Sequence, residues 1–274
     1  MLNEIISDIK REKSYSNVSN KIIRNLSNKI LVPIVESYLK ENKPNLDSKR
    51  EYLKTIKEIR KNLEMVYGIY NPEIKKRYLL LKQLKKDPTN EEIYGKILST
   101  HISSKERLED YEKIYKEIFE ITGKPKKILD LASGINPVSL PFMHLDNITY
   151  IAVELNPEDI KFLKEYFSIV SGIYNLKTEI IQKNLIEKNS FPESDVCFIF
   201  KALDNLETLR QGVTRYLLKS IPTKYFVISF PTKTLYRKNL NIKRLAWFNK
   251  LVKQPVKIKT GNEIFYIVKK ENIY

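Results

Sequence analysis

Cysteine, histidine and glycine are scarce in this sequence, which has one, two and seven of them among 274 residues. One cysteine excludes an intrachain disulfide and a zinc site built from several cysteines, and neither histidine has a second metal ligand nearby in the sequence. No apolar run approaches the roughly 20 residues that cross a membrane, and the N-terminus is amphipathic and charged rather than signal-like. We therefore expect a monomeric cytoplasmic protein with no metal site and no membrane contact.

Basic residues are abundant, with 49 lysines and arginines against 33 acidic residues and a formal charge of +16. A positive field of this size attracts polyanions such as nucleic acid, although a lysine-rich composition is also typical of thermophiles and of biased genomes. The 17 tyrosines and 11 phenylalanines offer surfaces for stacking bases, while most aromatic side chains simply form core. Composition therefore favours a nucleic-acid partner.

Residues 1–105 show helical periodicity and no convincing strand, and prolines punctuate them near expected helix ends. We predict helices over residues 48–69 and 72–86. The second would turn its basic side chains outward, including Lys75, Lys76 and Arg77. The pattern predicts a small, basic, all-α domain over residues 1–105 that docks RNA.

From Lys127 onward, apolar runs alternate with segments of helical periodicity. The expected strands are 127–131, 149–153, 178–182, 195–200, 224–230 and 263–269. The expected helices are 137–144, 156–171, 205–220 and 242–252. This alternation predicts a doubly wound, Rossmann-like α/β domain over residues 106–274, in which the last strand closes the sheet as an antiparallel edge.

The most informative segment is a strand, a turn and a second strand between Ile128 and Glu154. The first strand is followed by a turn with Gly134, and the second strand ends on the acid Glu154. In α/β folds such a glycine turn approaches a nucleoside, and such an acid accepts hydrogen bonds from its ribose hydroxyls. Because Ala132-Ser133-Gly134 lacks the three-glycine spacing of dinucleotide sites, S-adenosylmethionine fits better. The alternative interpretation of this segment is an ordinary strand–turn–helix unit that binds no ligand.

Polar residues near other strand ends are candidates for the rest of the site. Arg107 can pair with the carboxylate of the cofactor's methionine part, or it can belong to a helix-capping segment. Asn184, after the third expected strand, can bond adenine or simply make a turn. Lys201, at the end of the fourth, can orient a target base or snorkel to solvent. The segment after the fifth expected strand can bind phosphate or stay solvated, and its basic residues include Lys233, Arg237 and Lys238.

The absence of some motifs narrows the choice of atom to which an S-adenosylmethionine-dependent enzyme would transfer the methyl group. No Asn-Pro-Pro-Tyr or Asp-Pro-Pro-Tyr run, the usual support for methylating an exocyclic amine, occurs in the sequence. Cys197 lies within an apolar strand, where burial makes a thiol a poor nucleophile for methylation at a ring carbon. With an exocyclic amine and a ring carbon disfavoured, the remaining candidate acceptor is a ring nitrogen with a free lone pair, such as N7 of guanine. Because that nitrogen loses no proton when it attacks, alignment and desolvation suffice for catalysis.

Taken together, these segments resemble the Arm/Rmt family of aminoglycoside-resistance methyltransferases, which modify N7 of a guanine in the decoding region of small-subunit ribosomal RNA. The likeness runs through five segments, namely 101–107, 129–143, 200–204, 228–235 and 261–267. It implies a 16S ribosomal RNA (guanine-N7) methyltransferase that acts on the small ribosomal subunit, either as a resistance determinant or as a housekeeping relative. The alternatives are a transfer RNA methyltransferase and a catalytically silent RNA-binding factor for ribosome assembly.

The resemblance also implies roles for single residues. Arg107 would hold the cofactor's carboxylate, Gly134 its methionine end, Glu154 its ribose and Asn184 its adenine. The further expected cofactor contacts are His101, Ala132, Ser133, Asn136, Leu155, Leu185 and Lys201. Lys201 and Lys233 are the expected catalytic residues. The residues expected to bind RNA are Lys75, Lys76, Arg77, Lys233, Arg237 and Lys238.

Overall fold

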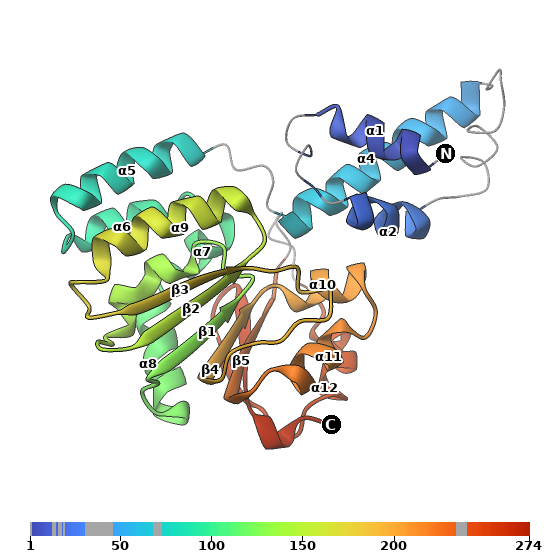
Figure 1. The fold of residues 1–274 in the computed structure, drawn as a ribbon. Coiled ribbons are helices and arrows are strands. Elements are labelled where there is room, and N and C mark those ends of the chain that lie inside the picture. Colours follow the sequence, from blue (N-terminus) through green and yellow to red (C-terminus); the bar gives the residue numbers. More distant parts are fainter. Residues whose placement is uncertain are drawn as a thin grey trace. The chain divides into compact units, whose positions relative to one another are not determined.

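The computed structural model describes residues 2–12, 15, 18, 20–30, 46–67, 73–233 and 240–274. Its contacts divide the chain into two compact units, Met1–Tyr70 and Asn71–Tyr274 (Figure 1). That residues 1–105 form a domain that docks RNA stays a prediction. Across the described ranges, none of the helices combines the length and the apolar character that a membrane span requires.

The first unit consists of helices in its described residues, namely α1 (Leu2–Lys10), α2 (Asn20–Ile30) and α4 (Leu46–Tyr67). Apolar side chains three or four positions apart lie on one face of each helix and are buried between them; they include Ile5, Ile9, Ile23, Leu26, Ile56, Ile59 and Leu63. The long helix α4 confirms the helix expected over residues 48–69 as far as Tyr67, and residues 68 and 69 lie outside the described residues.

The second unit begins with helices α5 (Ile74–Lys86), α6 (Glu91–Leu98), α7 (Ile102–Arg107) and α8 (Tyr111–Thr122). Asn90 caps α6 by accepting a hydrogen bond from the backbone of Glu92. Gly123 ends α8 with φ +72°, a conformation that glycine adopts without strain. These helices lead the chain onto the sheet.

The sheet has seven strands in the order β3-β2-β1-β4-β5-β7-β6. They are β1 (Lys127–Leu131), β2 (Thr149–Glu154), β3 (Lys177–Gln182), β4 (Ser194–Phe200), β5 (Thr223–Pro231), β6 (Val256–Lys259) and β7 (Glu263–Lys269). Strands β1 to β5 run parallel, and β7 pairs antiparallel with both β5 and β6. The Rossmann-like fold is therefore confirmed, but the expectation that β7 forms the edge is wrong, because β6 covers it.

Helices between the strands differ from expectation in detail. They are η2 (Asn136–Met143), α9 (Pro157–Val170), α10 (Leu203–Leu209), α11 (Val213–Ser220), η3 (Ile242–Leu245) and α12 (Ala246–Asn249), and a short helix, η4 (Lys270–Asn272), follows β7. The single helix expected over 205–220 is two helices, because Gly212 between them has φ +81°. The segment expected as a helix over 137–144 is a 3₁₀ helix with Pro141 inside it.

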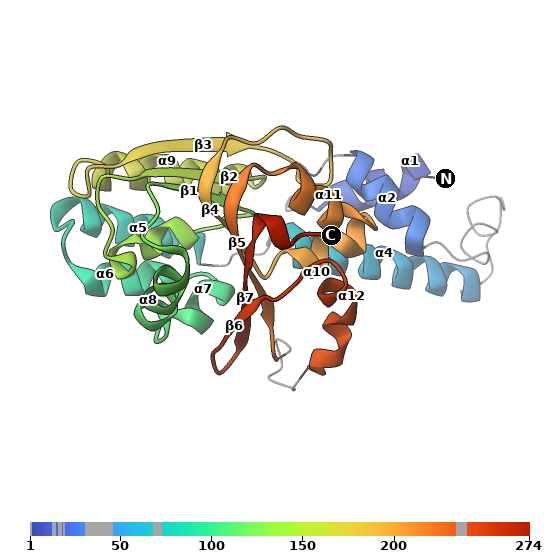
Figure 2. The same cartoon turned by 90° about the horizontal axis from the view of Figure 1, so that it is seen from below.

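The inner strands of the sheet, β1, β2, β4, β5 and β7, are buried on both faces. Side chains of α5, α6, α8 and α9 share one apolar cluster with the sheet. Helices α10 to α12 lie on the opposite side of the sheet from α8 (Figure 2). The carboxyl ends of the parallel strands consequently form an edge where the connecting loops meet, which is where open α/β sheets bind ligands.

Candidate functional site

The loops after β1 and β4 carry backbone strain at the carboxyl edge of the sheet. Ala132 has φ +51° and Lys201 has φ +53°. A non-glycine residue in this left-handed region costs about 1–3 kcal/mol, and such residues cluster at active sites and ligand clamps. Both positions are among the expected site residues, whereas the other described non-glycine residues with a positive φ, His144, Asn147, Asn175 and Gln254, are not.

Glu154 joins the turn after β1 to the end of β2. Its Oε2 accepts a hydrogen bond of 2.7 Å from the backbone N–H of Gly134. Its Oε1 accepts from the N–H groups of Leu155, at 2.7 Å, and Asn156, at 2.9 Å. Burial, with a smaller contribution from Asp159, raises the pKa of Glu154 to about 7. The acid is thus fixed in place and only partly ionised at neutral pH.

His101 covers the glycine turn from the start of α7. A Cβ on Gly134, which has φ +50°, would lie 3.5 Å from His101 Nε2. Nδ1 of the imidazole lies 3.4 Å from the Ser104 hydroxyl. Burial lowers the pKa of His101 to about 4, so the imidazole is neutral at pH 7 and offers one hydrogen-bond donor and one acceptor.

Arg107 is almost completely buried, with 3% of its surface exposed. Its Nε donates to Glu263 over 3.0 Å, and its Nη1 donates to Asn136 Oδ1 over 3.0 Å and to the Tyr111 hydroxyl over 3.2 Å. Its guanidinium carbon also lies 5.0 Å from the centre of the Phe200 ring. The side chain is therefore a fixed cation next to the η2 segment, with the Nη2 group outside these contacts.

Glu263, at the start of β7, connects Arg107 with Lys201. Only 1% of its surface is exposed. Its Oε2 lies 3.1 Å from Lys201 Nζ as well as 3.0 Å from Arg107 Nε, and its Oε1 accepts a hydrogen bond from Ser229. Lys201 Nζ also pairs with Glu106 at 2.5 Å. The structure therefore brings together Arg107 and Lys201 through an acid to which the sequence analysis gave no role.

Asp130 lies beneath this cluster within β1. Its Oδ2 accepts hydrogen bonds from Asn136 Nδ2, at 3.0 Å, and from the Tyr150 hydroxyl, at 2.7 Å. Burial raises the pKa of Asp130 to about 6. Asn136 also accepts a hydrogen bond from Arg107, so its amide links Asp130 of β1 to the guanidinium.

Asn184 follows β3, next to the ribose-binding candidate. The N–H of Lys183 donates to the backbone oxygen of Glu154 over 3.2 Å, which fixes this loop beside β2. The side-chain oxygen of Asn184 accepts from the N–H of Ile186 over 3.3 Å, the pattern of a turn asparagine. Leu185 is buried. The adenine contacts of Asn184 and Leu185 stay predictions.

The expected RNA-binding residues separate into different environments. Lys75 and Lys76 are exposed on α5. The expectation that Arg77 points outward is wrong, because it lies on the same helix face as Leu80, Leu81 and Leu84 and is 0% exposed. Its charge is compensated inside by Asp159. Lys233 is partly exposed directly after β5, and Arg237 and Lys238 lie outside the described residues.

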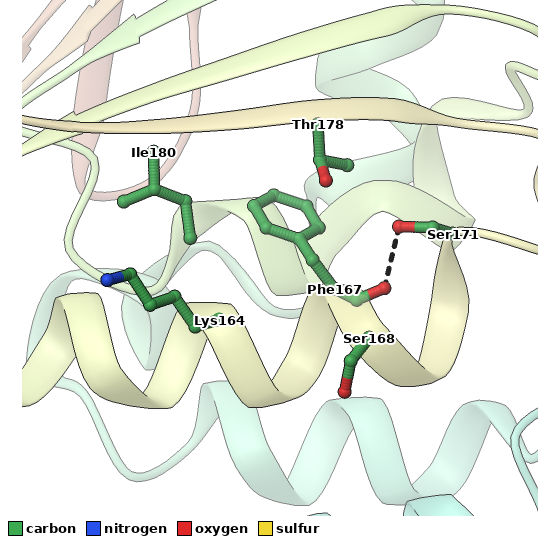
Figure 3. A pocket seen from close by; sticks show the side chains of 6 residues that line it. All are labelled: Lys164, Phe167, Ser168, Ser171, Thr178 and Ile180. Carbon is green, nitrogen blue, oxygen red and sulfur yellow. Dashed lines mark hydrogen bonds between the residues drawn. The ribbon is translucent and has the colours of Figure 1, made fainter.

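A pocket of about 380 Å³ lies away from these residues, between α9 and β3 (Figure 3). Lys164, Phe167, Ser168, Ser171, Thr178 and Ile180 line it. Its Ser171 hydroxyl is already bonded to the backbone oxygen of Phe167. The pocket contains none of the expected site residues, and we assign it no ligand.

Comparison with known proteins gives consistent matches. Residues 39–247 match the family described as ribosomal RNA methyltransferase (FmrO). A 16S rRNA (guanine(1405)-N(7))-methyltransferase of Proteus mirabilis is 28% identical over 235 residues, which cover 77% of this chain and 83% of that protein. One from Micromonospora echinospora is 26% identical over 229 residues, covering 78% and 82%. The solved structure of the 16S rRNA methyltransferase RmtF with S-adenosyl-L-homocysteine has a TM-score of 0.75 at 20% identity, over 98% of this chain and 97% of that one.

Proposed function

Because the chain belongs to the FmrO, Arm and Rmt family of 16S ribosomal RNA guanine-N7 methyltransferases, we propose that it methylates N7 of a guanine in 16S ribosomal RNA, using S-adenosylmethionine. The observation that supports this most directly is the hydrogen bond between Glu154 and Gly134. It joins the acid after the second strand to the glycine turn after the first, which is the arrangement that a nucleoside cofactor needs.

The residues of this edge fit S-adenosylmethionine. A carboxylate has about four acceptor positions, and three backbone N–H groups occupy positions on Glu154, so acceptor capacity remains for a ribose hydroxyl. The Nη2 group of Arg107 suits the planar carboxylate of the methionine part. Between them, Gly134 has no side chain to obstruct the cofactor, and His101 borders the turn.

The chemistry requires little proton transfer from the protein. When bound, S-adenosylmethionine supplies an electrophilic methyl group on a sulfonium. The guanine N7 lone pair forms the new N–C bond while the S–C bond breaks, and no proton leaves the base. Lys201, held after β4 by Glu106 and Glu263, would orient the base or its phosphate. Positioning and exclusion of water carry the reaction.

The basic surface supplies the RNA contacts in this proposal. Helix α5 exposes Lys75, Lys76, Lys82, Lys85 and Lys86. Ammonium groups of this kind bind phosphates without reading sequence, which suits the folded RNA surface of a small ribosomal subunit. Lys233 lies next to the carboxyl edge, at the end of β5, and would contact RNA near the target base. The protein would act as a monomer.

A methylation assay tests the proposal. Purified small subunits, naked 16S ribosomal RNA and transfer RNA are each incubated with isotope-labelled S-adenosylmethionine, and digested RNA is mapped by mass spectrometry. We expect 7-methylguanine in the 16S ribosomal RNA. Label in transfer RNA alone would replace this proposal by the transfer RNA alternative. If calorimetry detects no cofactor binding at millimolar concentration, the protein is an RNA-binding factor without this activity.

A further inference from the structure

Arg77 is a buried cation that the proposed reaction does not use. It lies on α5, is 0% exposed, and its Nη1 donates to Oδ1 of Asp159 on α9 over 2.5 Å, across 82 positions of the chain. Its guanidinium carbon lies 5.3 Å from the centre of the Phe162 ring. Burying a charge is costly unless a partner compensates it, so this contact between α5 and α9 needs an explanation.

One arm of the contact leads to the ribose-binding candidate. Asp159 Oδ2 accepts a hydrogen bond of 3.2 Å from the Asn156 side chain. The backbone N–H of Asn156 donates to Glu154 Oε1 over 2.9 Å. Asn156 also caps α9, because its Oδ1 accepts from the N–H of Glu158 over 3.0 Å. A continuous series of hydrogen bonds therefore runs from Arg77 through Asp159 and Asn156 to Glu154.

The other arm leads to the residue that covers the glycine turn. Arg77 Nε donates to the Thr100 hydroxyl over 3.1 Å, and that hydroxyl donates to the backbone oxygen of Ile97 over 2.6 Å. Thr100 directly precedes His101, whose imidazole borders Gly134. A single guanidinium thus fixes the segments on both sides of the expected cofactor position.

We propose that Arg77 and Asp159 form a positioning pair that holds Asn156 and the Glu154 carboxylate in the cofactor-binding orientation and balances the charge beside that carboxylate. The inference rests on the proposed function. It assigns to α5 a second task besides RNA contact, because the same helix that exposes Lys75 and Lys76 is connected to Glu154 through Arg77 and Asp159.

The charges of Arg77 and Asp159 distinguish a positioning role at Glu154 from a purely structural role in packing α5 against α9. Asp159 is the acidic neighbour that, after burial, contributes most to raising the pKa of Glu154. His101 is neutral at pH 7, and the Lys183 ammonium is engaged by the backbone oxygen of Ser190. Removing Arg77 would leave the negative charge of Asp159 unbalanced, whereas neutralising Asp159 would remove it. The two changes should therefore shift the ionisation of Glu154 in opposite directions.

The test is the affinity for S-adenosylhomocysteine, measured by calorimetry between pH 6 and 9, for the full chain with Arg77→Met, Asp159→Asn and both together. For the wild type, we expect affinity to rise with pH through about 7. In Arg77→Met this rise should move to higher pH, which weakens binding at pH 7 by about fivefold for a move of one unit. In Asp159→Asn it should move to lower pH, and in the double variant it should lie between those of the single variants. Arg77→Lys, which keeps the charge, should restore the wild-type profile.

Matched variants separate the outcomes. Asp195→Asn removes a comparable carboxylate at the amino end of β4, where it binds Lys224 and two backbone N–H groups, and should leave the profile unchanged. Single variants that lose affinity without moving the pH profile, or that change neither, would overturn the positioning pair while leaving the proposed function intact. No binding by the wild type would overturn the proposed function itself. If Arg77→Met does not fold, Asp159→Asn and Arg77→Lys still decide, because a profile that stays in place for Asp159→Asn contradicts the inference.

Discussion

Arg107 and Glu263, 156 positions apart in the chain, form a 3.0 Å ion pair in which both side chains are almost completely buried. The same carboxylate lies 3.1 Å from Lys201 Nζ. One acid on β7 thus compensates two cations, one expected to bind the cofactor and the other the base. Because burying Arg107 without this acid would be costly, the cluster depends on Glu263.

Glu263→Gln should lower the free energy of unfolding by up to about 3–5 kcal/mol, since it leaves the buried Arg107 and the partly buried Lys201 with less compensation. S-adenosylhomocysteine, which brings a carboxylate to Arg107, should recover part of this loss. Denaturant unfolding with and without the ligand measures both effects. We expect a larger ligand-induced stabilisation in the variant than in the wild type; equal stabilisation would mean that the ligand carboxylate does not bind near Arg107.

Glu154→Ala should weaken S-adenosylhomocysteine binding tenfold or more, because a hydrogen bond to a charged group contributes about 1.5–3 kcal/mol. The pKa of the carboxyl is raised to about 7, so the ionised, ribose-binding form gains population as the pH rises from 6 to 8. Wild-type affinity should increase over this interval, and Glu154→Gln should remove the increase. Calorimetry across the interval checks both; unchanged affinity in Glu154→Ala would exclude the ribose role.

Much of the sheet could be predicted from the sequence, because each buried strand has its own pattern of apolar residues. The limits of β1 and β7 agree with the predicted runs, because strands buried on both faces are nearly continuous apolar segments. The short edge strand β6 was missed, since only Ile258 is buried in it. The sequence predicts a single helix over 205–220, but the chain forms two helices there, because the positive φ of Gly212 interrupts the helical backbone.

Buried charges were the harder part of the site. The outward placement of Arg77 followed its basic neighbours on α5, but its burial depends on Asp159, which no local pattern connects to it. Glu263 had a usable signal, because an acid begins a strand in which the next five residues are apolar and buried. By contrast, Gly134 and Glu154 stand at positions that a local pattern reveals, the turn after one strand and the end of the next, and the structure brings them into contact. Their cofactor roles stay predictions. The family resemblance drawn from the sequence is confirmed.

Gly134→Ala should cost about 1–2 kcal/mol of stability, because alanine must adopt φ +50°. The new Cβ would lie 3.5 Å from His101 Nε2, an ordinary contact, so strain rather than collision is the cause. Gly172→Ala is the matched control, since open space surrounds its Cβ position. Denaturant unfolding compares the two variants. We also expect weaker S-adenosylhomocysteine binding in Gly134→Ala only, and equal affinities would argue against the close approach of the ligand to this turn.

Lys75→Met with Lys76→Met should reduce the salt dependence of RNA binding. Each lost phosphate contact lowers the slope of log affinity against log salt by about 0.7–0.9, because fewer counterions are released. Both ammonium groups are exposed, whereas Arg77 on the same helix is buried and is left in place. The control is Lys113→Met with Lys116→Met, which removes two exposed lysines from α8. Binding of small-subunit RNA over a salt series should separate the pairs, and equal slopes in both would mean that α5 lies outside the RNA footprint.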